Sequence, residues 1–102
     1  MIESSNDEEL KQLMNTNDVV IVDCYASWCG PCKALIPTLE NIEQNSSIKF
    51  IKANIETHQE IVKKLNIRSV PTLIFIDKGD IQSSLIGFRT ESQIKLWIAD
   101  NS

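Results

Sequence analysis

Apolar residues follow two patterns along the chain. The uninterrupted runs at 19–22 and 72–76 consist mainly of branched aliphatic side chains, which is typical of strands buried on both faces of a sheet. Elsewhere apolar residues recur at intervals of three and four, the spacing of one helix face. These patterns predict strands over 2–4, 19–22, 48–55, 72–76 and 81–86. They also predict four helices: one that starts after residue 5, one over 31–44, one over 57–65 and one that starts after residue 90.

Particular residues mark where three of these helices begin. Ser5 with Glu8, and Thr90 with Gln93, have the spacing of a capping box, in which two side chains bond to free N–H groups at a helix start. Pro31 suits a first helical turn, because the N–H that it lacks would have no helical partner there.

The order of the elements sets the fold class. Strands and helices alternate as β-α-β-α-β-α-β, and such units place strands in parallel. The turn at 77–80 joins the last two strands as an antiparallel hairpin, and a helix ends the chain. We expect an α/β fold with a mixed central sheet, in one domain over 1–102, because 102 residues are the size of a single domain.

Composition and charge exclude several classes of function. Hydrophobic residues make up 42% of the chain and charged residues 24%, as in globular proteins. The net charge of -4 and the scattered basic residues argue against binding to nucleic acid or to an anionic membrane surface. No apolar run approaches the roughly 18 residues of a membrane helix. The first five residues lack the features of a secretory signal.

All three cysteines, Cys24, Cys29 and Cys32, lie within nine residues. A bridge between Cys29 and Cys32 closes a very small loop and stabilises the fold little, so chemistry is the better reason for the pair. The same spacing can bind zinc, but a structural zinc site needs four ligands, and only Cys24 and His58 remain as candidates. We therefore expect a redox centre in a reducing compartment, and no metal.

The predicted position of the pair gives its two cysteines different roles. Cys29 comes just before a helix, where free N–H groups and the helix dipole favour a thiolate near neutral pH. Cys32 lies one turn inside the helix and is expected to be more shielded. We therefore expect Cys29 to attack a disulfide and Cys32 to resolve the product. Between them, Gly30 leaves room for a partner and Pro31 stiffens the loop.

The chain resembles the thioredoxin family over nearly its whole length. Four stretches and two glycines carry the similarity: Val22-Asp23, Trp28-Cys29-Gly30-Pro31-Cys32-Lys33, Lys52-Ala53-Asn54-Ile55-Glu56, Ile67-Arg68-Ser69-Val70-Pro71-Thr72, Gly79 and Gly87. The WCGPC motif is highly specific, since glutaredoxins and periplasmic oxidases differ between their cysteines.

The resemblance implies the thioredoxin fold, a central sheet flanked by four helices, and the activity of a protein disulfide reductase. Such a protein needs no cofactor of its own. It receives electrons from thioredoxin reductase, a flavoprotein that uses NADPH, and passes them to disulfides of target proteins. We expect a cytoplasmic monomer.

The resemblance also gives roles to Asp23 and Lys52. It implies that Asp23 lies beneath Cys32 and relays its proton, with Lys52 nearby. A carboxyl buried in an apolar strand without a partner costs several kcal/mol, so the pKa of Asp23 is expected to rise. The alternatives are a structural Asp23 bonded to backbone amides and an ordinary exposed Lys52.

A further set of residues is expected to receive target proteins. The resemblance implies that the peptide bond before Pro71 is cis and faces the disulfide, which frees the backbone of Val70 to pair with an extended target segment. An apolar rim for docking is expected from Trp28, Val70, Pro71, Gly87 and Phe88. The alternative for Phe88 is a core aromatic side chain.

Three residues depart from the family pattern. Tyr25 stands where the family usually has tryptophan, and Ser69 where many members have glycine; both could alter which partners dock. Cys24 is not part of the pattern, and we expect it to be a small buried hydrophobic residue.

Two other functions stay open from the sequence. An exported thiol oxidase or isomerase would share the cysteine pair, although the missing secretory signal and the Gly-Pro between the cysteines weigh against it. An adaptor without turnover would use the fold alone, and the intact cysteine pair weighs against that reading.

Overall fold

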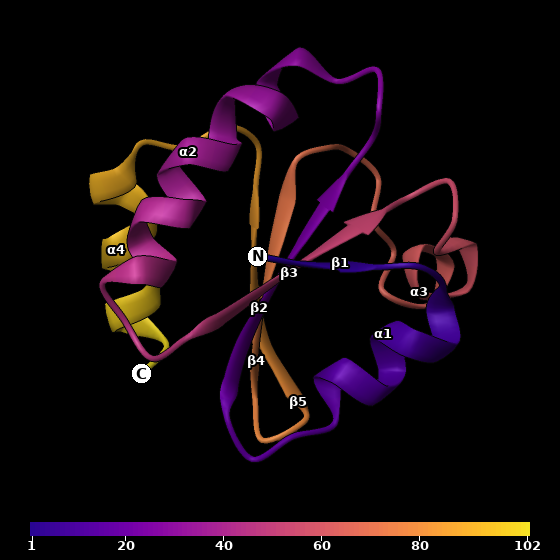
Figure 1. Cartoon of the computed structure of the whole chain (residues 1–102), viewed down its shortest axis with the longest axis horizontal. Helices are drawn as coiled ribbons and strands as arrows, with labels where there is room; N and C mark the ends of the chain where they lie inside the picture. Colours follow the sequence, from indigo (N-terminus) through magenta and orange to yellow (C-terminus); the bar gives the residue numbers. More distant parts are fainter.

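Five strands form one mixed sheet in the order β1-β3-β2-β4-β5, and four helices pack on it (Figure 1). The computed structural model describes every residue from Met1 to Ser102. The strands are β1 (Ile2–Ser4), β2 (Val19–Tyr25), β3 (Lys49–Asn54), β4 (Thr72–Asp77) and β5 (Asp80–Ile86). The helices are α1 (Asp7–Met14), α2 (Gly30–Gln44), α3 (Gln59–Lys64) and α4 (Glu91–Asp100). The predicted element order and the mixed sheet are confirmed. No helix has the length and apolar character needed to cross a membrane.

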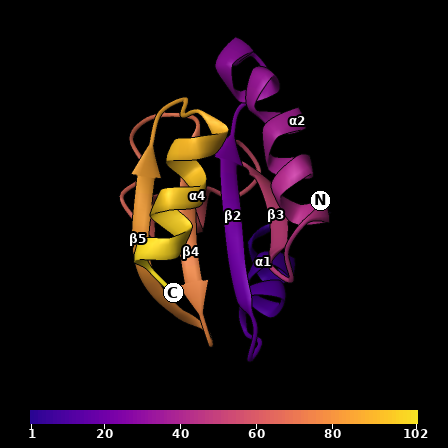
Figure 2. The same ribbon diagram turned by 90° about the vertical axis from the view of Figure 1, so that its left-hand side faces the viewer.

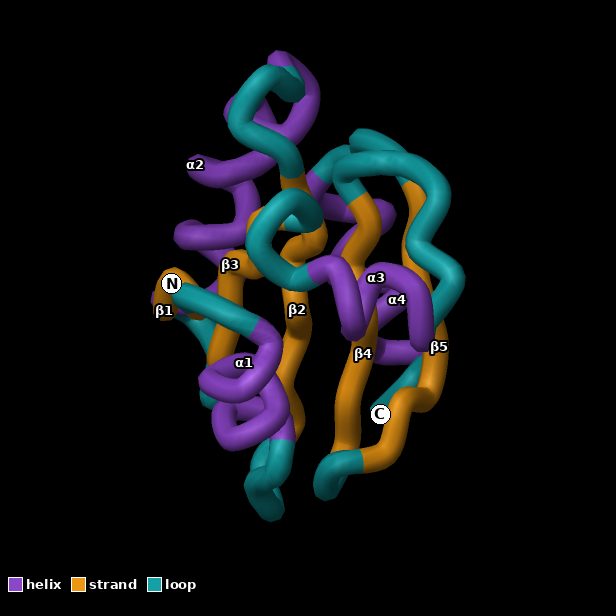
Figure 3. The backbone as a smooth tube through the Cα atoms, turned by 90° about the vertical axis from the view of Figure 1, so that its right-hand side faces the viewer, coloured by secondary structure: helices purple, strands orange, loops and turns teal.

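The helices form a layer on each face of the sheet. Figure 2 shows α2 and α4 over one face, and Figure 3 shows α1 and α3 over the other. Strand side chains alternate between the faces, so Val22 and Cys24 lie in the core with α1 and α3, whereas Ile21 lies in the core beneath α2 and α4. The same alternation places Asp23 on the α2 face, with Cys24 on the opposite one.

One prediction about strand direction is wrong. β1 and β2 run parallel to β3, but β4 runs antiparallel to β2 although a helix separates β3 from β4. Tyr25 at the end of β2 pairs with Asn54 at the end of β3. Cys24 pairs with Thr72, the first residue of β4. The connection through α3 therefore leaves one end of the sheet and returns to the same end, which brings Pro71 to the edge where β2 and β3 finish.

The predicted helix starts are confirmed for α4 and wrong for α1. Thr90 and Gln93 form a capping box at the start of α4. At α1 the cap is Asn6, whose side chain accepts the backbone N–H of Glu9 at 2.9 Å. The Glu9 carboxylate in turn accepts the N–H of Ser5 at 2.9 Å. Asparagine caps a helix as well as serine does, so Asn6 with Glu9 caps α1 in place of the predicted Ser5 with Glu8.

Helix α3 is shorter than predicted, because a turn occupies 55–57 and the helix begins only at Gln59. Its own cap position has no side-chain hydrogen bond. Instead, the carboxylate of Asp7 in α1 accepts the backbone N–H groups of Glu60 and Ile61, each at 3.1 Å. A residue of one helix thus caps the start of another.

Candidate active site

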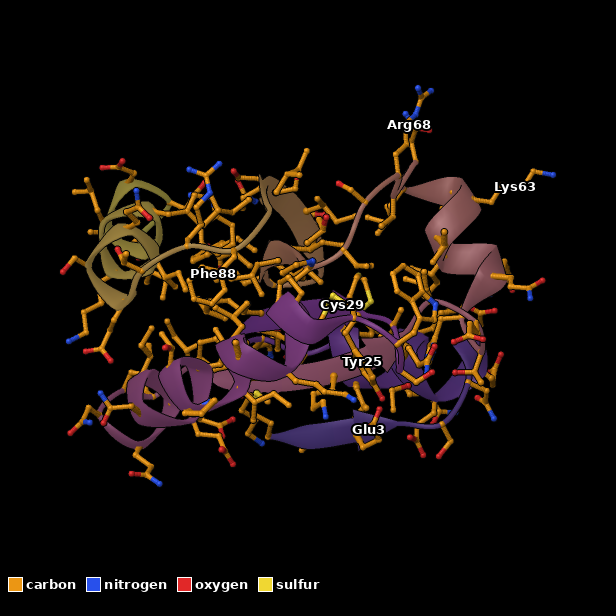
Figure 4. The ribbon with its side chains drawn as sticks, turned by 90° about the horizontal axis from the view of Figure 1, so that it is seen from above. Glu3, Tyr25, Cys29, Lys63, Arg68 and Phe88 are labelled. Atoms are coloured by element: carbon orange, nitrogen blue, oxygen red, sulfur yellow. A yellow bond between two sulfur atoms is a disulfide. The ribbon has the colours of Figure 1, made fainter.

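The cysteine pair lies where the loop after β2 enters α2, and Figure 4 shows Cys29 at that end of the helix. Cys29 and Cys32 form a disulfide, with their Cα atoms 5.3 Å apart. Pro31 occupies the first turn of α2, as predicted. A Cβ added at Gly30 would meet nothing within 4 Å, so the space beside the disulfide is open.

Cys29 is the N-cap of α2. Its backbone is extended, with φ −91° and ψ 108°, and its Sγ accepts the backbone N–H of Cys32 at 3.1 Å. The first N–H groups of a helix have no helical partner and carry the positive end of the helix dipole. A thiolate on Cys29 would occupy this position, and no acidic residue lies in the first turn to oppose it. The local geometry therefore favours the ionised form of Cys29.

Exposure does not separate the two cysteines, contrary to the sequence prediction. Cys29 retains 4% of its accessible surface and Cys32 retains 3%. Both belong to a small buried cluster against which Tyr25, Ile55 and Val70 pack. Because neighbours cover both sulfurs, the difference between the cysteines lies in the cap position of Cys29.

Asp23 is fully buried, and neither of its carboxylate oxygens has a hydrogen-bond partner in the protein. The alternative of an Asp23 held by backbone amides is therefore wrong. The pKa of Asp23 rises from 3.8 to about 7, mainly because the carboxyl is buried. The charge of Lys52 opposes this rise in part, and the charge of Glu3 adds to it. The expected rise of this pKa is confirmed.

Lys52 lies directly beside Asp23, because the two residues pair in the register of β2 and β3. Its ammonium does not form a salt bridge with Asp23. The Nζ atom lies 3.6 Å from Oε1 of Glu3 and 4.6 Å from the centroid of the Tyr25 ring. Only 21% of the Lys52 side chain is accessible, so it is not the ordinary exposed lysine of the alternative reading.

Asp23 and Cys32 share a cavity of about 270 Å³ on the α2 face. Its remaining lining residues are Tyr25, Ala26, Ser27, Lys33, Ile36 and Lys52. The buried carboxyl of Asp23 and the side chain of Cys32 therefore face one common space.

A second cavity of about 350 Å³ forms an apolar groove beside Cys29. It is lined by Trp28, Ile55, Ile67, Arg68, Ser69 and Val70. Trp28 is 72% exposed and stands at its edge. The Val70–Pro71 peptide bond is cis, as expected, and neither the N–H nor the C=O of Val70 forms a backbone hydrogen bond.

Sequence reasoning missed three residues of this groove: Ile55, Ile67 and Arg68. Ile55 follows β3, and the other two lead toward Pro71 and β4. Once β4 is known to start where β3 ends, all three lie at the same end of the sheet. Because β4 was predicted to run in the opposite direction, the sequence did not place these three residues at the site.

Three other predicted docking residues, Pro71, Gly87 and Phe88, do not line the groove. Gly87 has a positive φ of +89°, and its N–H donates to the carbonyl of Pro71 at 2.8 Å. Phe88 is 51% exposed, so it is not a core aromatic. Figure 4 shows Phe88 to the left of Cys29 and Arg68 above it. Exposed side chains therefore surround Cys29 in more than one direction.

Cys24 and His58 lie apart from this chemistry. Cys24 is buried in the core with α1 and α3, as predicted, and burial raises the pKa of its thiol to about 12. His58 is buried, with Nε2 at 2.8 Å from Oγ of Ser4 and Nδ1 at 2.8 Å from the carbonyl of Asn54. No three His, Cys, Asp or Glu side chains gather closely enough to hold a metal ion.

Comparison with known proteins agrees with this geometry. The sequence profile of the Thioredoxin family matches residues 1–100. The chain belongs to the thioredoxin family. It is 41% identical over 92 residues to a thioredoxin of Mycoplasmoides gallisepticum, an alignment that covers 89% of this chain and 92% of that one. A thioredoxin of Rickettsia prowazekii is 33% identical over 101 residues, with 96% of each chain covered.

Solved thioredoxins also share the fold. The reduced thioredoxin of Schistosoma mansoni superposes with a TM-score of 0.91 at 29% identity, over 99% of this chain and 97% of that one. The thioredoxin of Plasmodium falciparum gives a TM-score of 0.88 at 30% identity, over the whole of both chains. With the family established and the cysteine pair intact, the chain is a disulfide oxidoreductase whose redox centre is Cys29–Cys32.

Proposed function

We propose that the chain reduces disulfides in other proteins, with Cys29 as the attacking thiolate and Cys32 as the resolving thiol. The observation that carries the assignment is the cap position of Cys29, whose Sγ accepts the N–H of Cys32 at 3.1 Å. A negative sulfur is stabilised there by the helix start, whereas Cys32 lies within the first turn and lacks this arrangement.

The reaction consists of two exchanges. The Cys29 thiolate attacks one sulfur of the target disulfide, forms a mixed disulfide, and releases the other target sulfur as a thiolate. Cys32 then loses its proton and attacks Sγ of Cys29. This second step closes the Cys29–Cys32 disulfide and releases the second target thiolate. The target gains two electrons, and the cysteine pair loses two.

Asp23 is the proposed acceptor of the Cys32 proton. Its buried carboxyl shares a cavity with Cys32, and burial raises its pKa to about 7. A base whose pKa lies near the working pH is suited to proton transfer. Lys52 is proposed to favour the ionised form of this carboxyl through its charge.

Target proteins are proposed to bind in the groove next to Cys29. The free N–H and C=O of Val70 can pair with an extended target segment, as an added strand does. The apolar lining supports burial of target side chains beside Trp28. Pro71, which follows Val70, completes the proposed docking surface together with Gly87 and Phe88.

The remaining assignments rest on the family. We propose that an NADPH-dependent thioredoxin reductase recharges the Cys29–Cys32 pair, and that the chain works as a single domain and a monomer in the cytoplasm. All three cysteines lie within nine residues of the sequence, and Cys24 is a buried free thiol, so no disulfide links distant parts of the chain. This cysteine usage supports a reducing compartment.

The test is NADPH oxidation coupled through a thioredoxin reductase to the reduction of insulin. We expect oxidation to depend on this chain, to disappear with Cys29→Ser, and to persist with Cys24→Ser as the matched control. Failure of the dithiol form to reduce insulin would refute the activity itself. Insulin reduction by chemically reduced chain without coupled NADPH oxidation would reject only the reductase. A reduction potential above about -200 mV would instead favour an oxidase.

A further inference from the structure

Asp23 belongs to a row of three polar side chains that come from three neighbouring strands. Glu3 of β1 pairs in register with Lys52 of β3, and Lys52 pairs with Asp23 of β2. Residues in direct register lie on the same face of a sheet, and neighbouring strands are about 4.8 Å apart. Glu3, Lys52 and Asp23 therefore form a row, in which one lysine stands between two acidic residues. Figure 4 shows Glu3 and Tyr25 next to each other at this edge.

The two carboxyl groups do not share the ammonium equally. Nζ of Lys52 lies 3.6 Å from Oε1 of Glu3, whereas both oxygens of Asp23 have no partner. Tyr25 holds this arrangement in two ways. Its hydroxyl donates to Oε2 of Glu3 at 2.7 Å, and its ring lies 4.6 Å from Nζ of Lys52. A cation over an aromatic ring is attracted to the ring face, so Glu3 and Tyr25 both draw the ammonium in the same direction.

We propose that Glu3, oriented by Tyr25, is a positioning residue that holds the Lys52 ammonium away from Asp23 and so keeps the buried carboxyl unpaired. The proposal rests on the proposed function, in which Asp23 accepts the Cys32 proton. It also gives a reason for tyrosine at residue 25, because its hydroxyl extends to the Glu3 carboxylate.

Among the groups around Asp23, only Glu3 and Asp23 compete for the Lys52 ammonium. On α2, Cys32 and Lys33 line the same cavity. Cys32 is held in the disulfide, and the charges that act on Asp23 are those of Lys52 and Glu3, not that of Lys33. On β4, the residue paired with Asp23 is the apolar Leu73. Cys24 is next in sequence but lies on the opposite face of the sheet. Lys52 therefore forms its ion pair with Glu3 and not with Asp23.

Removing the charge of Glu3 has a definite expected effect. In Glu3→Gln, Asp23 becomes the only carboxylate in the row, and Lys52 can turn toward it. An opposite charge at short range lowers a carboxyl pKa by about 1–3 units, so the pKa of Asp23 is expected to fall by at least about half a unit. The acidic limb of the pH profile for disulfide reduction is expected to move to lower pH by the same number of pH units as the Asp23 pKa falls.

The experiment is a ¹³C NMR titration of the Asp23 carboxyl in the whole oxidised protein. The variants are Glu3→Gln, Lys52→Met and the double variant. Glu40→Gln is the control, because it removes the same negative charge from an exposed residue of α2. We expect a fall of the Asp23 pKa in Glu3→Gln, most of which disappears in the Lys52→Met background, and no change in Glu40→Gln.

Two results would overturn the proposal. An unchanged or higher pKa of Asp23 in Glu3→Gln would show that Glu3 does not hold Lys52 away. An equal fall with and without Lys52 would show that Glu3 acts on Asp23 directly. The titration does not depend on the exchange rate, so failure of Asp23 as a proton acceptor would be seen separately, in the rate of disulfide reduction by Asp23→Asn.

Discussion

Replacing Asp23 with asparagine is expected to stabilise the fold and slow the chemistry at once. The carboxyl is fully buried and unpaired in the oxidised protein, and burial raises its pKa to about 7. The amide of asparagine has nearly the same shape but cannot ionise. The substitution therefore removes the cost of a buried charge while it keeps the packing.

The size and sign of the stability change follow from the two pKa values. Folding raises the Asp23 pKa from 3.8 to about 7, so the unfolded chain loses its proton first as pH rises. Stability is then lost between about pH 4 and pH 7. At 1.36 kcal/mol per pKa unit, the loss reaches about 4 kcal/mol above pH 7, and Asp23→Asn recovers it. Below about pH 4 both states are protonated, and the two proteins are expected to be equally stable.

Urea unfolding of the oxidised proteins between pH 4 and pH 8 measures this difference. The free energy of unfolding of the variant is expected to exceed that of the parent by an amount that grows with pH. In single-turnover reduction of a protein disulfide, the same variant is expected to be slower by up to about 10²-fold, because Cys32 loses its proton acceptor. A variant that is less stable at pH 7 and equally fast would refute both the buried charge and the proton transfer.

Two further predictions concern residues outside the redox pair. In the reduced native protein, a thiol-alkylating reagent is expected to label Cys29 far faster than Cys24, because burial raises the pKa of Cys24 to about 12; equal labelling would place Cys24 at the surface. Asp7→Ala is expected to lower the free energy of unfolding by about 1–2 kcal/mol, because the start of α3 loses its cap. Glu8→Ala, which removes an exposed charge from the same turn of α1, is the matched control, and an equal loss in both would show that capping is not the cause.

Local patterns in the sequence were sufficient for most of the fold. Runs of branched aliphatic residues marked β2 and β4, and helical spacing with the Thr90–Gln93 pair marked α4, because these features depend on neighbours in the chain. The direction of β4 depends instead on where the connection through α3 returns, which no local pattern states.

The site divides in the same way. The motif and the helix start located Cys29 and Cys32, and the polar residue within a buried strand identified Asp23. The contact between Glu3 and Lys52 was not predictable, because it requires the parallel pairing of β1 with β3. Long-range register thus determined the parts that sequence reasoning missed.

Trapping of a mixed disulfide tests most directly that Cys29 attacks and Cys32 resolves. Cys32→Ser leaves the attacking thiolate at the helix start but removes the thiol that releases the target. Mixed with a disulfide-bonded target protein and analysed on a non-reducing gel, Cys32→Ser is expected to accumulate a covalent adduct that dithiothreitol removes. Cys29→Ser is expected to form little. Accumulation of the adduct with Cys29→Ser instead would contradict the assignment and exchange the roles of the two cysteines.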